Sequence, residues 1–404
     1  MNSSAALAPA PRVTLEWAKR AVALTFAANG MAFGSWASRT PAVKSALHLR
    51  ASGLGVLLIC ISIGSLVALP VSGAVVQRFG TRRAVLGSAG LETSGLLLAA
   101  YGLASGQVLV TGAGLILTGL GIGTWDVAMN VEGADVERRL GRSIMSRFHA
   151  AWSLGSVAGA ALGAGLAAAD IGVSAQLVAT AVVIAVLAAV GVSRYLRFVP
   201  HVPVPSRDGS GRSSLSEGWR DRRTLVIGLM VLAFAFMEGV ANDWIALASV
   251  DGLGVTQAMG AVTFGCFVSA MTLSRVLGGG FLDRWGRVAV LRASVFVAAA
   301  GLLLVISGPM LPLVLAGGVL WGAGTALGFP TGMSAAADDV PRAAIHVSVV
   351  SSIGYTAFLA GPPIVGFLAD AVGVRQALYV VLVAIALSLV TAGRARPLVP
   401  ADGR

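Results

Sequence analysis

A series of long apolar runs is the feature that most constrains the fold of this chain. The runs are rich in Ala, Leu, Val and Gly, and short polar turns separate them. A helix of about 20 such residues crosses the hydrocarbon core of a bilayer. Closed β-barrels also satisfy their backbone in lipid, but their strands need alternating apolar and polar residues. Because these runs are continuous, the sequence predicts an all-α membrane protein.

The charge content of the chain agrees with this prediction. Charged residues make up 12% of the sequence and hydrophobic residues 56%, whereas soluble proteins keep about 25% of their residues charged. The formal net charge of +11 is distributed over separate short turns, and it does not gather on one face as in a nucleic-acid-binding protein. We therefore expect the lipid bilayer, and no nucleic acid, as a partner.

Twelve membrane spans are predicted, divided into six and six by the longest polar segment. Their limits are 18–38, 52–76, 83–104, 107–131, 147–168, 175–198, 224–246, 257–281, 289–308, 312–336, 346–369 and 375–394. The polar segment is rich in Pro, Ser, Gly and Arg, a composition typical of a flexible linker. The predicted organisation is an N-terminal six-helix bundle (1–198), a cytoplasmic linker (199–223) and a C-terminal six-helix bundle with a short cytoplasmic tail (224–404).

Basic residues are concentrated in alternate turns between the spans. Arg78 and Arg82 share one such turn, and Arg284 and Arg287 share another, whereas four of the intervening turns have no Lys or Arg. Cytoplasmic turns of membrane proteins carry this excess of basic residues. The pattern predicts that both termini lie in the cytoplasm. The excess of Arg over Lys, with abundant Ala and Gly, favours a bacterial protein of the cytoplasmic (inner) membrane.

The two halves of the chain are related by an internal duplication. GAVVQRFGTRR at 73–83 aligns with GGFLDRWGRVA at 279–289 at a constant offset of 206, which also relates Cys60 to Cys266. GLGIGTWD at 119–126 aligns with LWGAGTAL at 320–327 at an offset of 201. Parallel repeats of this kind, related by an axis along the membrane normal, build one large class of secondary transporter.

The pattern G-x-x-x-D-R-x-G-R at 279–287 resembles the signature loop of the major facilitator superfamily. Six further segments resemble a bacterial subfamily near the fucose permease: SWASRTPAVK (35–44), GTWDVAMN (123–130), SIMSRFHAAWSLG (143–155), MEGVANDWIAL (237–247), AMTLSRVLGG (270–279) and GYTAFLAGPPIVGFLAD (354–370). The resemblance implies twelve helices in two pseudo-symmetric bundles and a monomer that works by alternating access. It also implies that spans one, four, seven and ten line a central cavity.

The two signature turns are predicted to form a cytoplasmic gate. Its residues are Gly73, Arg78, Gly80, Arg82, Gly279, Asp283, Arg284, Gly286 and Arg287. The first glycine of each copy would let two helices approach closely, and the second would permit a tight reversal. Asp283 would face a helix N-terminus in the opposite half, at the start of the fifth span. In the first copy Gln77 replaces the acid and Thr81 replaces a basic residue. The alternative is that both turns only fix the topology.

Ionisable and amide groups inside the spans are the candidate substrate and proton-coupling residues, because such groups are costly in lipid. They are Asn29, Asp126, Asn130, Glu238, Asn242, Asp243 and Arg275. Burial disfavours the charged form of a carboxylate, which allows it to take up a proton. By resemblance, Asp126 lies where the fucose permease has a cavity carboxylate. The first span has Asn29 in place of that permease's second acid, and Glu238 is a candidate for its role.

Each of these groups also has a structural alternative. Asp126 or Glu238 would then pair with a neighbouring Arg or cap a helix break, and Asp243 would lie at the cavity rim. Arg275 would anchor an anionic substrate, neutralise an acid, or extend to the cytoplasmic surface. Glu92 lies in a span that is peripheral in the superfamily, so a structural ion pair is expected there.

These observations predict a secondary transporter that moves a small polar solute, such as a sugar or related metabolite, together with protons. The alternative is a proton-driven exporter of a drug or metabolite. The fifth span lacks the Gly-Pro pair that drug–proton antiporters of the superfamily carry, which favours the first function. An enzyme would need a nucleophile or metal constellation, and a sensor would need a soluble output domain. We expect no metal and no cofactor.

Overall fold

The computed structural model describes residues 12–140, 144–196, 218–339 and 342–398, and this part of the chain is helical with no strand. The first half contains α1 (Arg12–Ala37), α2 (Thr40–Ala46), α3 (Ala51–Ala104), α4 (Val108–Leu140), α5 (Met145–Ala168) and α6 (Val173–Val192). The second half contains α8 (Arg222–Leu253), α9 (Gln257–Trp285), α10 (Arg287–Ser307), α11 (Leu311–Thr325), α12 (Gly328–Ala336), α13 (Ala343–Val372), α14 (Val374–Ala377), η2 (Leu378–Val380), α15 (Val381–Thr391) and η3 (Ala392–Ala395).

The predicted spans correspond to these helices. Ten helices in the described residues are long and apolar enough to cross a membrane. One of them, α3, contains two predicted spans, because its backbone breaks at Gly80 with φ 78° and ψ 160°. With α1 as the first span, this gives the twelve predicted segments. The largest boundary error is in α4, which continues to Leu140 and not to 131, since Glu132 and Val136 remain buried there.

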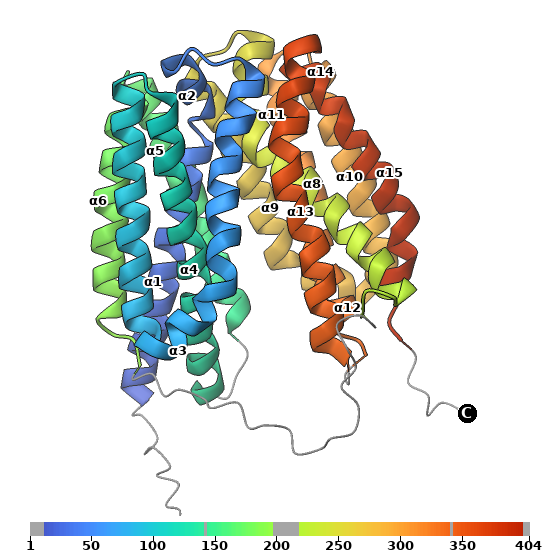
Figure 1. The fold of residues 1–404 in the computed structure, drawn as a ribbon. Coiled ribbons are helices and arrows are strands. Elements are labelled where there is room, and N and C mark those ends of the chain that lie inside the picture. Colours follow the sequence, from blue (N-terminus) through green and yellow to red (C-terminus); the bar gives the residue numbers. More distant parts are fainter. Residues whose placement is uncertain (1–11, 141–143, 197–217, 340–341, 399–404) are drawn as a thin grey trace, which may run out of the picture.

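The helices form two bundles that follow the two halves of the sequence (Figure 1). In the first half α1 packs on α5 and α6, and α3 packs on α4 and α6. In the second half α8 packs on α13 and α15, and α11 packs on α9 and α10. Residues 197–217, which hold most of the predicted linker, lie outside the described residues. Its last residues enter α8, which begins two residues earlier than predicted.

Small residues set the distance between α1 and α5. A Cβ atom added to Gly34 would lie 2.0 Å from the backbone oxygen of Ser156, and one added to Gly155 would lie 2.0 Å from that of Ala27. Glycines in membrane helices allow such backbone contact, which supplies packing in place of a hydrophobic driving force. The first bundle therefore depends on glycine at this crossing.

Gly155→Val is expected to lower the thermal unfolding midpoint of the purified protein strongly, because the added atoms would meet backbone and not a flexible side chain. Overpacking of this kind costs about 3 kcal/mol. Gly165→Val on the same helix is the matched control, since a Cβ at Gly165 meets nothing within 4 Å. Equal midpoints for the two variants would show that the α1–α5 crossing is not limiting.

The two bundles meet at one end of the molecule, here called the joined end and formed by residues 38–55, 243–256 and 362–375. Lys44 pairs with Asp251, and the backbone N–H of Ser52 donates to Asp370 Oδ1 at 3.2 Å. Close backbone packing accompanies these polar contacts, as between Gly55 and the Pro362 oxygen. The bundles converge at α2 and α14 and diverge toward α12 (Figure 1). The diverging end, which carries the turns at Gly80 and Gly286, is here called the open end.

Candidate functional site

A cavity of about 340 Å³ lies between the two bundles. Its walls come from α1, α3, α4 and α5 of the first half and from α8 and α13 of the second. The polar or charged lining residues are Ser62, Ser65, Glu92, Thr118, Asp126, Glu238, Asn242 and Asp243, and the aromatic ones are Phe33, Trp36, Trp152, Tyr355 and Phe358. A volume of this size fits a small solute. Of the four spans expected to line it, the first, fourth and seventh do so, but the tenth (312–336) contributes no lining residue. Residues of the second, third, fifth and eleventh spans complete the wall.

Asp126 lies on α4 and reaches the cavity as a carboxylate without a cationic partner. Asn130, one turn further along the helix, donates from Nδ2 to the Asp126 backbone oxygen at 2.8 Å and to Oδ1 at 3.2 Å. Among the described residues no Lys, Arg or His forms an ion pair with Asp126. The structure therefore places Asp126 and Asn130 together, with the carboxylate held by an amide.

Glu238 is in a different electrostatic position, because it pairs with Arg275. Nη2 of Arg275 donates to the two carboxylate oxygens at 2.9 and 2.8 Å, and Nε donates to the backbone oxygen of Ala326 at 3.2 Å. The contact joins α8 to α9 and reaches the end of α11. Of the roles considered from sequence, the structure shows Arg275 neutralising an acid.

Asn242 and Asp243 follow Glu238 by one turn on α8, and both line the cavity. Asn242 is 7% exposed as a residue, and its side-chain Oδ1 has no hydrogen-bond partner. The Asp243 backbone oxygen accepts from Thr40 at 3.4 Å, which places this residue where the cavity meets the joined end. Asn242 thus presents an unsatisfied acceptor in the cavity wall.

Glu92 was expected in a structural ion pair, and the structure contradicts this. Its side chain is fully buried in the cavity wall, and neither carboxylate oxygen has a partner. The resemblance implied a peripheral third span, but this part of α3 packs closely on α4 at Gly121, so that Glu92 and Leu96 line the cavity. An acid in the middle of an apolar span was the only sequence signal for it.

Asn29 does not line the cavity but positions a residue that does. Its Oδ1 accepts from Trp152 Nε1 at 2.9 Å, and the Trp152 ring packs on Phe33 at 5.4 Å between centroids. Trp152 and Phe33 are both lining residues. The Asn29 amide therefore orients the Trp152 ring in the cavity wall.

The signature turns have the backbone geometry predicted from their second glycines. Gly80 and Gly286 have φ values of 78° and 74°, in the region that L side chains rarely adopt. The prediction of close helix approach at Gly73 and Gly279 was wrong for this structure, because a Cβ on either would meet nothing within 4 Å. The reason is that the two halves are apart at the open end, where these glycines lie.

The charged residues of the turns are mostly solvated. Arg82 and Asp283 are exposed, and Arg78 and Arg284 stack on the neighbouring rings of Phe79 and Trp285 at 5.8 and 5.4 Å. Asp283 has no hydrogen bond or ion pair within the described residues. Its contact with the opposite half stays a prediction for a state in which this end is closed.

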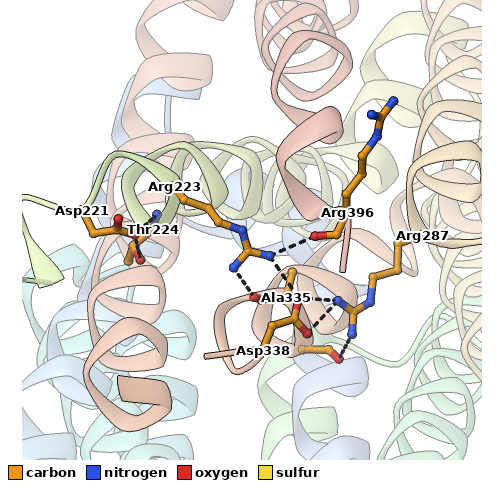
Figure 2. A network of polar contacts seen from close by, with 8 residues as sticks. Asp221, Arg223, Thr224, Arg287, Ala335, Asp338 and Arg396 are labelled. Atoms are coloured by element: carbon orange, nitrogen blue, oxygen red, sulfur yellow. Dashed lines mark hydrogen bonds and ion pairs between the residues drawn. The ribbon is translucent and has the colours of Figure 1, made fainter. Parts of the chain in front are cut away.

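Arg287 belongs to a polar network inside the second half (Figure 2). Its Nη1 donates to the two oxygens of Asp338 at 2.9 Å, and Arg223 Nη2 donates to the same carboxylate at 3.0 Å. Arg223 also donates to the backbone oxygens of Ala335 and Arg396, at 3.1 and 3.0 Å. Through Arg223 and Arg287, Asp338 therefore links the starts of α8 and α10 to the end of α12 and to the residue after η3.

The first half has a corresponding contact with fewer hydrogen bonds, in which Glu132 is the acceptor in place of Asp338. Thr81, which aligns with Arg287, donates to Glu132 Oε2 at 2.6 Å, and the backbone N–H of Leu196 donates to Glu132 Oε1 at 2.7 Å. The replacement of a basic residue by Thr81 thus keeps a hydrogen bond to the fourth span. Sequence comparison alone did not show this, because the acceptor is 51 residues away.

Asp338→Asn is expected to lower the free energy of unfolding by about 2 kcal/mol, because Arg223 and Arg287 lose their shared counter-ion. The thermal unfolding midpoint of the purified protein measures this. Asp339→Asn is the matched control, since Asp339 pairs only with Arg342, at 3.5 Å and more exposed to solvent. A midpoint unchanged by Asp338→Asn would show that the network does not stabilise the open end.

Comparison with known proteins agrees with this architecture. A family model of the Major Facilitator Superfamily matches residues 22–342 and 244–403. The uncharacterized transporter y4wD of Sinorhizobium fredii is 35% identical over 92% of this chain and 95% of its own length. The membrane protein MosC of Rhizobium meliloti is 30% identical over 90% of this chain and 86% of its own length.

Solved structures show the same fold at low sequence identity. A variant of the nucleoside transporter NupG superposes with a TM-score of 0.74 at 13% identity, covering 94% of this chain and 98% of that one. A variant of the fucose:proton symporter FucP of E. coli superposes with a TM-score of 0.64 at 16% identity, with the same coverage. The chain therefore belongs to the Major Facilitator Superfamily, and it is a multi-pass membrane transporter and not an enzyme.

Proposed function

We propose that this transporter moves a small polar solute across the bacterial cytoplasmic membrane, with Asp126 carrying the coupled proton. The observation that carries the proposal is the position of Asp126, a carboxylate in the cavity between the halves with an amide and no cation beside it. Such a group is neutral when water and counter-ions are excluded and ionises when they return. It changes its charge as access to the cavity changes sides.

Glu238 has a different role in this proposal. Its carboxylate receives two charge-assisted hydrogen bonds from Arg275, at 2.9 and 2.8 Å, and such bonds are among the strong ones in proteins. Glu238 and Arg275 therefore form a fixed ion pair that shapes the second-half wall, and Asp126 is the exchanging group. This assigns one proton carrier to the first half.

We infer the orientation from the basic turns. Arg78, Arg82, Arg284 and Arg287 belong to the turns at Gly80 and Gly286, which lie at the open end. The start of α1 lies at the same end (Figure 1), and Arg396, after the last helix, contacts Arg223 there. The excess of basic residues at cytoplasmic turns supports an open end and termini that face the cytoplasm. The joined end then faces the periplasm, and the cavity is reached from inside the cell. Transport by a monomer needs both halves to rock about this cavity.

The names of structural neighbours support a hydrophilic solute. They include the fucose:proton symporter FucP, a D-xylose–proton symporter and the nucleoside transporter NupG. These share the fold, and the polar groups in the cavity of this chain suit a solute with several hydrogen-bonding groups. A drug-like apolar cation would leave these groups unpaired, at a cost.

The proposal is tested in two steps. A thermal-shift screen of the purified protein against sugars, amino sugars, sugar acids and drugs finds a stabilising solute. Proteoliposomes with an entrapped pH-sensitive dye then show whether a gradient of that solute moves protons. Co-directional movement is the expected result. Movement in opposite directions would establish the exporter alternative, and solute flux without proton flux would remove the coupling.

A further inference from the structure

The ionisable lining of the cavity is acidic. Glu92, Asp126, Glu238 and Asp243 line it, and no Lys, Arg or His does so in the part of the chain that the structure describes. Arg275, behind the wall, offsets Glu238. Three of these carboxylates have no cationic partner among the described residues: neither Glu92 oxygen has a bond, Asp126 has only Asn130, and Asp243 forms no ion pair. The cavity therefore attracts positive charge.

The unsatisfied polar groups of the wall point to the same kind of ligand. Besides the two oxygens of Glu92, Asn242 Oδ1 is buried and has no donor. The unsatisfied donors of this region, Asn29 Nδ2, Trp125 Nε1 and Trp244 Nε1, belong to residues that do not line the cavity. A buried acceptor without a donor is costly, so the missing partner is a group rich in N–H or O–H bonds.

Aromatic rings form the rest of the recognition surface. Phe33, Trp36, Trp152, Tyr355 and Phe358 come from both halves. The indole N–H of Trp152 is already bonded to Asn29, which leaves its π-system for a ligand. Rings of this kind attract an ammonium group as well as the carbon face of a polyol.

We propose that the transported solute carries a protonated amine, in a polar molecule of about the size of an amino sugar. This inference rests on the proposed function and adds the solute's charge to it. The ammonium group binds between the unpaired carboxylates and donates to Asn242. Of these carboxylates, Asp126 carries the proton and Asp243, which is partly accessible, holds the amine. A sugar acid is repelled from this cavity, and a neutral sugar leaves the acids without a counter-charge.

The electrostatic potential of the cavity is tested first, because this test does not require the solute to be known. It compares how fast a cysteine in the cavity reacts with a cationic and with an anionic reagent. Ile122→Cys, one turn from Asp126 on α4 and in the cavity lining, is made in a Cys60→Ala/Cys266→Ala background. Its rate of modification is compared for trimethylammonium-ethyl and sulfonato-ethyl methanethiosulfonate. Ser105→Cys, in the exposed turn before α4, corrects for the intrinsic reactivity of the two reagents. The corrected rate for the cation is expected to be at least about tenfold higher.

Adding Asp126→Asn and Asp243→Asn to the Ile122→Cys protein is expected to reduce this ratio by at least about threefold. Asp170→Asn is the control for the loss of a carboxylate elsewhere, because it removes one such group from an exposed turn where φ is 56° and Asn is well tolerated. A ratio of one or less, or a cysteine that reacts with neither reagent, would overturn the inference.

The solute is then tested with charge-matched probes on one scaffold: glucosamine, glucose, N-acetylglucosamine and glucuronate, and a parallel series of amino and hydroxy cyclitols. Stabilisation and proton-linked uptake by the amines alone are the expected results. Proton-linked uptake of only neutral or anionic members, or no stabilisation by any amine, would overturn the inference. A neutral solute that moves with protons would leave the proposed function standing. Binding of an amine without proton-linked flux would instead contradict the proposed function.

Discussion

Asp126→Asn is expected to abolish solute-driven proton movement in proteoliposomes while solute exchange across the membrane continues. Asn has nearly the same shape as a protonated Asp, so the cavity keeps its neutral form and can still change sides. It cannot release a proton, and the coupled cycle therefore stops at the step where the proton should leave. Net uptake driven by a pH gradient is expected to fall by more than about tenfold. A tenfold change corresponds to a free-energy difference of about 1.4 kcal/mol. Dye-reported proton flux and counterflow of labelled solute measure the two parts separately.

Asp170→Asn, measured in the same assay, controls for loss of a carboxylate in general. It lies in the exposed turn between α5 and α6 and should leave proton flux and exchange as in the parent protein. Unchanged coupling in Asp126→Asn would remove this residue as the proton carrier. Loss of both coupling and exchange would instead indicate that the carboxylate is needed to hold the solute.

Glu238→Gln is expected to lower the free energy of unfolding by about 2 to 3 kcal/mol, because it leaves the Arg275 guanidinium in the protein interior without its counter-ion. The two side chains are 14% and 30% exposed, so water screens only part of this cost. The thermal unfolding midpoint of the purified protein should fall clearly, and the yield of folded protein with it.

The double variant Glu238→Gln/Arg275→Gln provides the control, since it removes both charges together and keeps polar side chains of similar length. It is expected to be more stable than Glu238→Gln alone, which a double-mutant cycle expresses as a coupling between the two positions. If the double variant loses the sum of the two single effects, the pair does not interact as the structure shows.

Most of the fold could be predicted from local sequence patterns. The length of each apolar run fixes a helix that crosses the bilayer, and the duplicated turns locate the reversals at Gly80 and Gly286. These features depend on residues that are neighbours in the chain. The cost of acids inside a membrane singled out Asp126 and Glu238 as candidates. Their presence in one cavity was expected from the resemblance to the superfamily, whose fourth and seventh spans line such a cavity.

The pairing of the polar groups could not be predicted in the same way. Glu238 and Arg275 lie on different helices, 37 residues apart, and only the packing of α8 on α9 brings them together. Glu92 reaches the cavity because α3 lies directly against α4 at Gly121. The open surroundings of Gly73 and Gly279 depend on the conformational state, which a single sequence does not specify.

The central claim is that the two halves rock about the cavity, and distances between spin labels across the halves test it most directly. One label pair is placed at the open end, on Phe79 and Trp285, and the other at the joined end, on Ser45 and Val372, all of which are exposed. Addition of the stabilising solute at acidic pH, or the Asp126→Asn change, should populate the opposite state. We predict that the open-end distance then shortens while the joined-end distance lengthens. If both distances stay constant, or both change in the same direction, the account is contradicted.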